Sequence, residues 1–300
     1  MIRIPVFTDF PGWQGARLKE AFAKRGYSAE FMSIKSCGLS IEAGNPRVII
    51  PGFNEPPAGV FVRGVPGGTV QQVISRLNIL HTLESDGVAV YNDAGMVERT
   101  VDKAATSLIL SKAGVSTPAT WVCESRHLAE EVIGRETSNG RSLVIKPLFG
   151  SQGDGVIKVK SVKEMPIPMG RYVDGVYYMQ EYIDSGEGAW HDYRVFIVND
   201  KVVGAMSRHG SGWVNNVAQG GRCEPISKSG DIAKLALAAA KAVNIHYCGV
   251  DVIKDVSGRL YVLEVNSIPA WRGLQGVENE SIAQLMVDDF TGRVMGNESA

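Results

Sequence analysis

Three short segments, far apart in the chain, each place charged or amide side chains on an apolar strand. They are residues 144–155, 191–198 and 263–269, which read VIKPLFGSQGDG, HDYRVFIV and LEVNSIP. A charged group is costly to bury unless it meets a partner, so the fold must gather these segments around one polar site. A lysine before a glycine-rich loop suits phosphate, and a carboxylate and an amide oxygen on one strand suit Mg²⁺. Together the segments predict an enzyme that uses ATP.

The overall composition is that of an ordinary globular protein. The chain has 300 residues, of which 44% are hydrophobic and 21% charged, and its formal net charge is -1. This length suffices for two or three compact units, and the near-neutral charge predicts neither nucleic acid nor a membrane as a partner. The N-terminus lacks a signal-peptide pattern, and the longest apolar run of small residues, 235–240, is too short to span a bilayer. We therefore expect a cytoplasmic protein.

Residues 1–95 show the strand–helix–strand order that is typical of a parallel α/β sheet. The expected strands are 2–7, 29–34, 47–50, 59–63 and 88–91. The expected helices are 18–25 and 70–83, and 11–15 is expected to be a turn-rich loop. This segment is predicted to form a small α/β domain.

Beyond residue 95 the pattern changes to two α+β units, so the predicted fold class combines α/β and α+β. The central unit is predicted at 96–183 and the C-terminal unit, which carries the metal site, at 184–300. The central unit is expected to have strands at 119–123, 143–146, 156–160 and 176–183 and helices at 103–113 and 127–133. The C-terminal unit is expected to have hairpins at 193–206 and 249–265, helices at 232–243 and 281–290, and a frayed tail at 291–300.

The second hairpin carries side chains with hard oxygen atoms. Side chains alternate along a strand, so Glu264 and Asn266 share one face. Asp251 comes within reach of them if the strands pair about the turn at 256–258. Two carboxylates and an amide oxygen are ligands that Mg²⁺ prefers. The alternative is that Glu264 pairs with a lysine at the sheet surface, but its apolar neighbours indicate a strand that is at least half buried.

Lys146 ends an apolar strand, where an ammonium group is costly unless an anion meets it. An ATP phosphate is such an anion, and Gly150, Gly153 and Gly155 would let the loop backbone approach it closely. The lysine precedes the glycines, so this is not a Walker A loop. A surface turn is the alternative for this segment, because Gly and Ser favour turns.

The first hairpin carries Asp192 and Arg194 on one face of a strand and Arg208 at the end of the return strand. A ribose hydroxyl would suit Asp192, and a phosphate or carboxylate would suit Arg194. An ion pair between Asp192 and Arg194 without any function is the alternative. Asn215 and Asn216 follow in a loop rich in Gly and Asn, for which a simple turn is the alternative.

Taken in order, these motifs resemble the ATP-grasp superfamily and, within it, the RimK-type glutamate ligases. The resemblance covers about residues 92–280. It rests on Asp102-Lys103 at a helix start, VIKPL and GSQGDGV at 144–156, QEYI at 180–183, DYRVFIV at 192–198, Arg208, NVAQGG at 216–221 and EVNSIP at 264–269. The segment FVRGVPGG at 61–68 resembles the domain that precedes the ATP-grasp unit in such ligases. The implied architecture is an ATP-grasp fold behind a Rossmann-like N-terminal domain.

The resemblance also implies a role for each motif, with ATP between the two α+β units and Mg²⁺ or Mn²⁺ as the metal. The implied nucleotide-binding residues are Lys103, Lys146, Ser151, Gly153, Gln180, Glu181, Tyr182, Ile183, Asp192 and Asn215. Among them, Lys103 and Lys146 would hold phosphates, and Glu181 and Tyr182 would contact adenine. The implied residues of the reacting end are Arg194, Arg208 and Asn216. The implied metal ligands are Asp251, Glu264 and Asn266.

The implied reaction is amide formation in two steps. A substrate carboxylate attacks the γ-phosphoryl group of ATP to give an acylphosphate and ADP, and an amine then displaces phosphate. The expected amine donor is glutamate, and the expected acceptor is a small molecule or coenzyme, such as a tetrahydromethanopterin-like or methylofuran-like cofactor. The alternatives are a kinase on the same scaffold, a ligase acting on a protein C-terminus, and a nucleotide-binding module without turnover. Related ligases often form dimers or tetramers, so a homo-oligomer is one expectation.

One stretch departs from the family members that modify a ribosomal protein. Those tend to continue with small residues after EVNS, whereas this chain continues with IPAWRGLQ at 268–275. The indole of Trp271 would suit stacking on a substrate ring, with interface packing as the alternative, and Arg272 would suit a carboxylate. The stretch looks more like that of ligases which extend a coenzyme or a carrier-bound substrate. A ribosomal protein is therefore not the expected acceptor.

Overall fold

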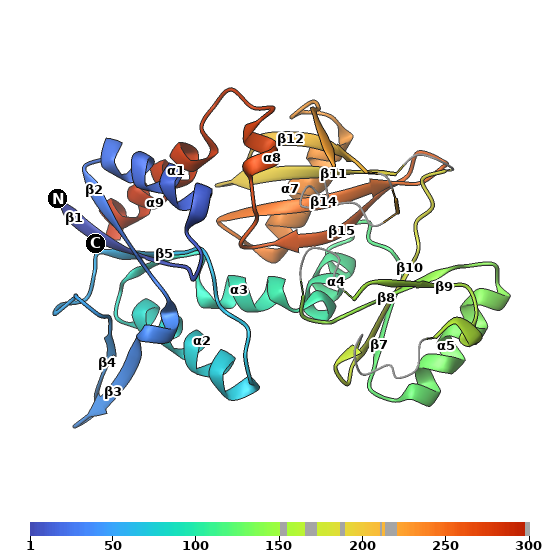
Figure 1. The fold of residues 1–300 in the computed structure, drawn as a ribbon, viewed down its shortest axis with the longest axis horizontal. Coiled ribbons are helices and arrows are strands. Elements are labelled where there is room, and N and C mark those ends of the chain that lie inside the picture. The colour runs from blue at the N-terminus through green and yellow to red at the C-terminus, as the bar shows by residue number, and fades with distance from the viewer. Residues whose placement is uncertain (151–154, 166–172, 187–189, 211, 214–220, 298–300) are drawn as a thin grey trace.

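Three main sheets build the molecule, and their arrangement confirms the predicted combination of α/β and α+β (Figure 1). The structure is a computed structural model that describes residues 1–150, 155–165, 173–186, 190–210, 212–213 and 221–297. One sheet is parallel and lies in the N-terminal unit. The other two sheets are antiparallel, are formed by later parts of the chain and lie next to each other. Within these residues, no helix is both long and apolar enough to cross a membrane.

The N-terminal sheet has four parallel strands in the order β2-β1-β5-β6. The strands are β1 (Ile2–Phe7), β2 (Tyr27–Met32), β5 (Gly59–Val62) and β6 (Ala89–Tyr91), and the hairpin β3 (Gly38–Glu42) and β4 (Asn45–Ile49) projects from them. The helices are α1 (Gly12–Lys24) and α2 (Val70–Ser85). Thr69 and Gln72 form a capping box that fixes the start of α2. Short 3-10 turns cover Ile34–Ser36 and Val162–Glu164.

The loop predicted at 11–15 is wrong, because α1 already begins at Gly12. Pro11 has backbone angles of φ -62° and ψ -46°, which suit the entry to a helix. Gly15 serves close packing, because a Cβ there would lie 2.5 Å from Cβ of Pro11 and 3.3 Å from the ring of Phe31. The residues that suggested a turn therefore form the first turn of a helix that packs tightly.

The central sheet has four antiparallel strands in the order β7-β10-β8-β9. They are β7 (Thr120–Cys123), β8 (Leu143–Lys146), β9 (Ile157–Val159) and β10 (Tyr177–Glu181), and α5 (Arg126–Ser138) packs against them. Two helices lead into this unit, α3 (Ala94–Val101), which the sequence did not predict, and α4 (Lys103–Lys112). Asp102 separates them with extended backbone angles, and its carboxylate accepts hydrogen bonds from the amides of Ala104 and Ala105.

The third sheet has five antiparallel strands in the order β13-β12-β11-β14-β15. They are β11 (His191–Val198), β12 (Lys201–His209), β13 (Arg222–Pro225), β14 (Tyr247–Lys254) and β15 (Leu260–Asn266). The alanine-rich helix α7 (Asp231–Val243) covers one face, where alternate strand residues such as Val195, Val250 and Val265 form an apolar core. Because side chains alternate, the charged residues of these strands point to the opposite face.

The C-terminal segment returns to the N-terminal unit. After the short helix α8 (Arg272–Gln275), α9 (Ile282–Asn297) packs against α1 and the first sheet, with Phe290 edge-on to Phe22 of α1 at 5.7 Å and to Phe61 of β5 at 5.4 Å between ring centroids. The predicted frayed tail is wrong for 291–297, because the helix continues and Thr291 and Val294 are buried. The predicted unit boundaries near residues 95 and 183 stay predictions.

Candidate active site

A cleft of about 1060 Å³ lies between the central sheet and the five-stranded sheet. Every predicted site residue that the structure describes lines this cleft. They are Lys103, Lys146, Gln180, Glu181, Tyr182, Ile183, Asp192, Arg194, Arg208, Asp251, Glu264 and Asn266. The predicted residues Ser151, Gly153, Asn215 and Asn216 lie outside the described residues. The structure thus brings together in space what the sequence holds in seven separate segments.

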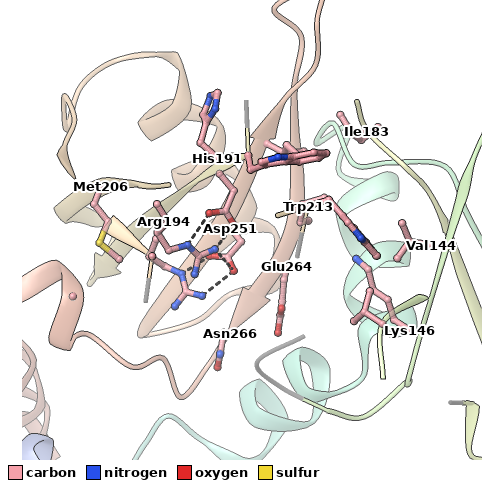
Figure 2. A pocket seen from close by; sticks show the side chains of 18 of the residues that line it. Val144, Lys146, Ile183, His191, Arg194, Met206, Trp213, Asp251, Glu264 and Asn266 are labelled. Carbon is pink, nitrogen blue, oxygen red and sulfur yellow. Dashed lines mark hydrogen bonds and ion pairs between the residues drawn. The ribbon is translucent and has the colours of Figure 1, made fainter. Parts of the chain in front are cut away.

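The wall formed by the five-stranded sheet carries charged side chains on neighbouring strands at matching positions. Arg194 on β11 pairs in register with Asp251 on β14, which pairs in register with Glu264 on β15. Asp192 on β11 pairs in register with Arg208 on β12. Residues directly opposite each other in antiparallel strands point to the same face, so these side chains form one polar surface (Figure 2).

Two β-bulges create this shared face. The β14–β15 register shifts by one residue between Asp251 and Val252. Without the shift, Asp251 would lie opposite Leu263, and Glu264 would point toward α7 instead of the cleft. A bulge next to the reacting end of a cleft therefore aims the side chains of the site.

The second bulge lies in the other hairpin, where the β11–β12 register shifts between Phe196 and Ile197. Without that shift, Asp192 would lie opposite Ser207, and Arg208 would leave the cleft face. Each bulge thus contributes one member to the charged surface.

Four of these charged groups form one buried ion-pair network. The Arg194 guanidinium grips both carboxylate oxygens of Asp251, with 2.8 Å between Nη2 and Oδ2. The Arg208 guanidinium grips both oxygens of Asp192, with 2.8 Å between Nε and Oδ1, and its Nη2 lies 3.0 Å from Oδ2 of Asp251. The alternative pair of Asp192 with Arg194 is wrong, because residues two apart on a strand are farther from each other than residues directly across it.

The network shifts the pKa of its members. Burial by itself raises the pKa of Asp251, but Arg194 and Arg208 outweigh burial and hold this pKa at about 2. For Asp192, burial prevails over Arg208 and raises the pKa, and the neighbouring Asp251 carboxylate adds to the rise. Asp251 therefore stays ionised at neutral pH, and it anchors both arginines on the cleft wall.

The opposite wall carries two lysines whose side chains meet only neutral acceptors. Lys146 donates to Oε1 of Gln180 at 2.7 Å, and Lys103 donates to the carbonyl of Gly150 at 3.0 Å and that of Leu148 at 3.3 Å. Burial lowers the pKa of Lys146 to about 8 and also lowers the pKa of Lys103, and Glu264 offsets only part of either shift. Two desolvated ammonium groups that no carboxylate contacts directly fit a site for phosphate.

Glu264 and Asn266 come from β15, the edge strand of the five-stranded wall, and Glu264 lies between Asp251 and Lys146 in Figure 2. The alternative in which Glu264 pairs with a surface lysine is not seen, because Glu264 has no hydrogen bond or ion pair among the described residues. Oδ1 of Asn266 accepts from the amide of Ile268 at 2.9 Å, which fixes the side chain at the strand end. Oδ1 of Asp251 accepts one N–H from Arg194, so a second lone pair of this oxygen stays available as a ligand.

These donors fit a divalent cation with oxygen ligands. An unpaired carboxylate, a spare carboxylate lone pair and an amide oxygen converge beside two lysines that need an anion. The described residues hold no cluster of three or more His, Cys, Asp and Glu side chains suited to a metal. A cation at this place would therefore complete its ligand shell with water and phosphate, as Mg²⁺ commonly does.

The far end of the cleft has an aromatic wall that the sequence indicated only in part. Tyr182 was predicted, and the structure adds Trp213, which meets the Tyr182 ring edge-on at 6.0 Å between centroids. Nζ of Lys158 lies 3.2 Å from the centroid of the Tyr182 ring. Trp190 also lines the cleft. No spacing linked these residues, because they come from different strands and loops.

Trp271 does not face the cleft, so the prediction of ring stacking on a substrate is wrong and the packing alternative is right. Its side chain is completely buried, between Arg63, 4.6 Å from the ring centroid, and Phe196, 6.5 Å away. Pro269 and Leu274 around it are buried as well. Arg272, by contrast, is exposed and lines the cleft.

The three-sheet fold and the cleft between two antiparallel sheets define an ATP-grasp enzyme, and comparison with known proteins agrees. A family model described as the RimK-like ATP-grasp domain matches residues 100–289. The chain belongs to the RimK-like ATP-grasp family of ATP-dependent carboxylate–amine ligases, as its motifs predicted.

Relatives with curated names support the glutamate-ligase side of the family. The chain is 33% identical to the tetrahydromethanopterin:alpha-L-glutamate ligase of Methanococcus maripaludis over 76% of this chain and 77% of that protein. It is 31% identical to the probable alpha-L-glutamate ligase 2 of Shewanella amazonensis over 96% of this chain and 94% of that protein. Neither name is that of a ribosomal protein modifier, as predicted.

Solved structures share the fold at low sequence identity. D-cycloserine synthetase DcsG matches with a TM-score of 0.74 at 17% identity, and the match covers 98% of this chain and 100% of that chain. A RimK domain ATP-grasp protein from Sphaerobacter thermophilus matches with a TM-score of 0.67 at 21% identity, covering 97% and 100%. At this identity the likeness supports the fold and nothing finer.

Proposed function

We propose that the protein is an ATP- and Mg²⁺-dependent ligase that adds L-glutamate to a carboxylate of a small molecule or coenzyme. The observation that carries this proposal is the cleft itself, where two lysines without a counter-anion face an unpaired carboxylate and two anchored arginines. The relatives named tetrahydromethanopterin:alpha-L-glutamate ligase make a tetrahydromethanopterin-like molecule the first acceptor to test.

The nucleotide would lie along the central sheet. Tyr182 with its neighbours Gln180, Glu181 and Ile183 would contact the adenine, and a ribose hydroxyl would donate to the free lone pairs of Asp192. Lys103 and Lys146 would hold the phosphates, which supply the negative charge that their burial calls for. The predicted contributions of Ser151, Gly153 and Asn215 belong to this proposal too.

The metal would be held by Glu264, by the open side of Asp251 and by Asn266. Bound there, Mg²⁺ or Mn²⁺ would neutralise phosphate charge that otherwise repels a substrate carboxylate. Arg194 and Arg208 lie beside this point on an ion-pair network that keeps them in place. Their preorganised positive charge would stabilise the transferring phosphoryl group, together with Asn216.

The chemistry needs no covalent bond to the protein. A carboxylate oxygen of the acceptor attacks the γ-phosphorus, the bond to the β-phosphate oxygen breaks, and ADP leaves. The glutamate amine then attacks the acyl carbon, phosphate leaves with the C–O bond electrons, and the amine loses a proton. The protein contributes positioning and charge neutralisation, which agrees with a site built from cations and oxygen ligands.

A mass-spectrometric screen tests the proposal. The enzyme is incubated with ATP, Mg²⁺, L-glutamate and a small-molecule extract, and the expected result is a product heavier by a glutamyl residue, formed together with ADP. Omission of either glutamate or extract should stop ADP formation. A phosphorylated product that persists when glutamate is present would select a kinase instead, and tight ATP binding without turnover in any extract would select a binding module.

A further inference from the structure

Most charged side chains that line the cleft are already partnered within the chain. The four members of the Asp251 network pair with one another, the two lysines donate to neutral acceptors, and Oε1 of Glu181 lies 3.5 Å from Nε of Arg141. Among the described residues, two charged side chains line the cleft with neither a hydrogen bond nor an ion pair, and they are Glu264 and Arg272. The metal proposal accounts for Glu264, whereas nothing so far accounts for Arg272.

Glu264 and Arg272 act at different places in the cleft. The Glu264 carboxylate lies on β15, directly across from Asp251, and it raises the pKa of both Lys103 and Lys146 against burial, so it belongs to the phosphate end. After Asn266 at the end of β15, the chain continues along the cleft through Ile268 and Ala270 to Arg272. Arg272 therefore lines the cleft from the segment that follows β15, whereas Lys103 and Lys146 come from α4 and β8.

The backbone before Arg272 is firmly held. Trp271 is completely buried under the guanidinium of Arg63, which also donates through Nη2 to the carbonyl of Pro269 at 2.9 Å. The amide of Gln275 donates to the carbonyl of Trp271 at 2.8 Å and closes the turn around Arg272. The residues on both sides of the arginine are thus fixed while its own head group stays open to the cleft.

The backbone after Arg272 is held as well. The side chain of Gln275 donates to the carbonyls of Glu278 at 3.2 Å and Glu280 at 2.9 Å, and it accepts from the amide of Ile282 at 3.0 Å. These bonds tie the short helix to the start of α9. Because the backbone on both sides of Arg272 is already ordered in the free protein, a ligand has to order little more than the Arg272 side chain. The small entropy loss favours binding.

We propose that Arg272 binds a substrate carboxylate that does not react, so that the enzyme selects substrates with a second negative charge. This inference rests on the proposed ligase function. The planar guanidinium matches a carboxylate through two parallel hydrogen bonds, and the reacting carboxylate belongs at the metal end beside Glu264. Two substrates carry a group of this kind. Glutamate keeps both carboxylates when it reacts through its amine, and an acceptor with a further acid group has one to spare.

Steady-state kinetics of Arg272→Met and Arg272→Lys test this assignment, with L-glutamate and the acceptor fraction from the extract screen each varied in turn. We expect Arg272→Met to raise the KM of one of the two substrates at least tenfold with kcat within about twofold, because the contact is made equally before and during reaction. Arg272→Lys should raise this KM less than Arg272→Met does, since lysine keeps the positive charge but cannot form the two parallel hydrogen bonds of a guanidinium. The substrate whose KM rises identifies the source of the carboxylate.

The matched control is Arg47→Met, an exposed arginine on the projecting β3–β4 hairpin, which should leave both KM values unchanged. If the wild type forms the glutamyl product and Arg272→Met leaves both KM values unchanged, or lowers kcat alone, the assignment of Arg272 is overturned while the ligase function stands. A wild-type enzyme that binds ADP but forms no glutamyl product with any extract overturns the ligase function and this inference with it.

Discussion

The cleft is bounded by two sheets, and the charged side chains on these two walls find their partners in different ways. On the five-stranded wall, Asp192, Arg194, Arg208 and Asp251 neutralise one another in a buried network. On the central wall, Lys103 and Lys146 meet only neutral oxygen atoms, and burial lowers the pKa of each. The network on the first wall is paired within the chain, whereas the lysines of the second depend on a substrate to supply their counter-charge.

Because of this difference, we expect mutations in the two walls to affect different properties of the protein. Removing one partner from the network leaves a buried charge unpaired, so the penalty falls on folding. Removing a charged group that has no ion-pair partner leaves the folded protein largely intact, so the loss appears in binding and catalysis. Glu264 is on β15 of the five-stranded wall but has no hydrogen bond or ion pair among the described residues, so its removal, like that of a lysine, should mainly affect binding and catalysis.

The largest effect is expected for Glu264→Gln. The amide keeps the size of the side chain but removes the negative charge that would hold Mg²⁺, so ADP formation should fall about 10³-fold or more. The free energy of unfolding should change by less than about 1 kcal/mol, because no described contact of Glu264 is lost. Coupled ADP assays and urea titrations measure the two quantities, and a rate near that of the wild type would remove Glu264 from the metal site.

Asp251→Asn should show the opposite balance between folding and catalysis. It leaves Arg194 and Arg208 buried with one carboxylate fewer, so we expect a loss of about 3 kcal/mol in the free energy of unfolding, in addition to lost turnover. Glu264→Gln is the matched control, because it removes a carboxylate from the neighbouring strand without breaking the network. Equal stability of the two variants in urea would contradict the distinction between the walls.

The residue types of the site, and much of the fold, could be predicted from the sequence because their signals are local. The turn at Asn199 and Asp200 is an example, since both residues take the positive φ that a tight hairpin turn requires, at 47° and 58°. Carboxylates and lysines on apolar strands indicated a polar site for the same reason, because their burial is costly without partners.

The register of the site could not be predicted, because it depends on two bulges. Simple pairing about the turn at 256–258 would place Asp251 opposite Leu263, so the predicted approach of Asp251 to Glu264 occurs only because of a shift that no residue pattern announced. The same holds for Arg208 and its unexpected partner Asp192. The positions of Trp271 and of α9 depend on packing between distant segments, which a local pattern does not contain.

The smallest but most specific effect is expected for Lys146 on the central wall, in the pH dependence of nucleotide binding. Its pKa of about 8 in the free protein means that it loses its proton as the pH rises through 8, and a phosphate would favour the protonated form. The affinity for AMPPNP with Mg²⁺ should therefore fall between about pH 7.5 and 9.5, with uptake of a proton on binding near pH 8.5. Calorimetry in two buffers of different ionisation enthalpy measures both quantities.

Lys146→Met should weaken AMPPNP binding at pH 7 about 30-fold, or about 2 kcal/mol, and should make the remaining affinity less dependent on pH. Lys234→Met, which removes an exposed lysine from α7, is the control and should match the wild type at every pH. Folding responds in the other direction, because below pH 8 the native state must hold a buried ammonium, so the stability of the free protein should rise from pH 8 toward 10. An AMPPNP affinity that rises with pH, or one that Lys146→Met leaves unchanged, would mean that Lys146 does not bind a phosphate of the nucleotide.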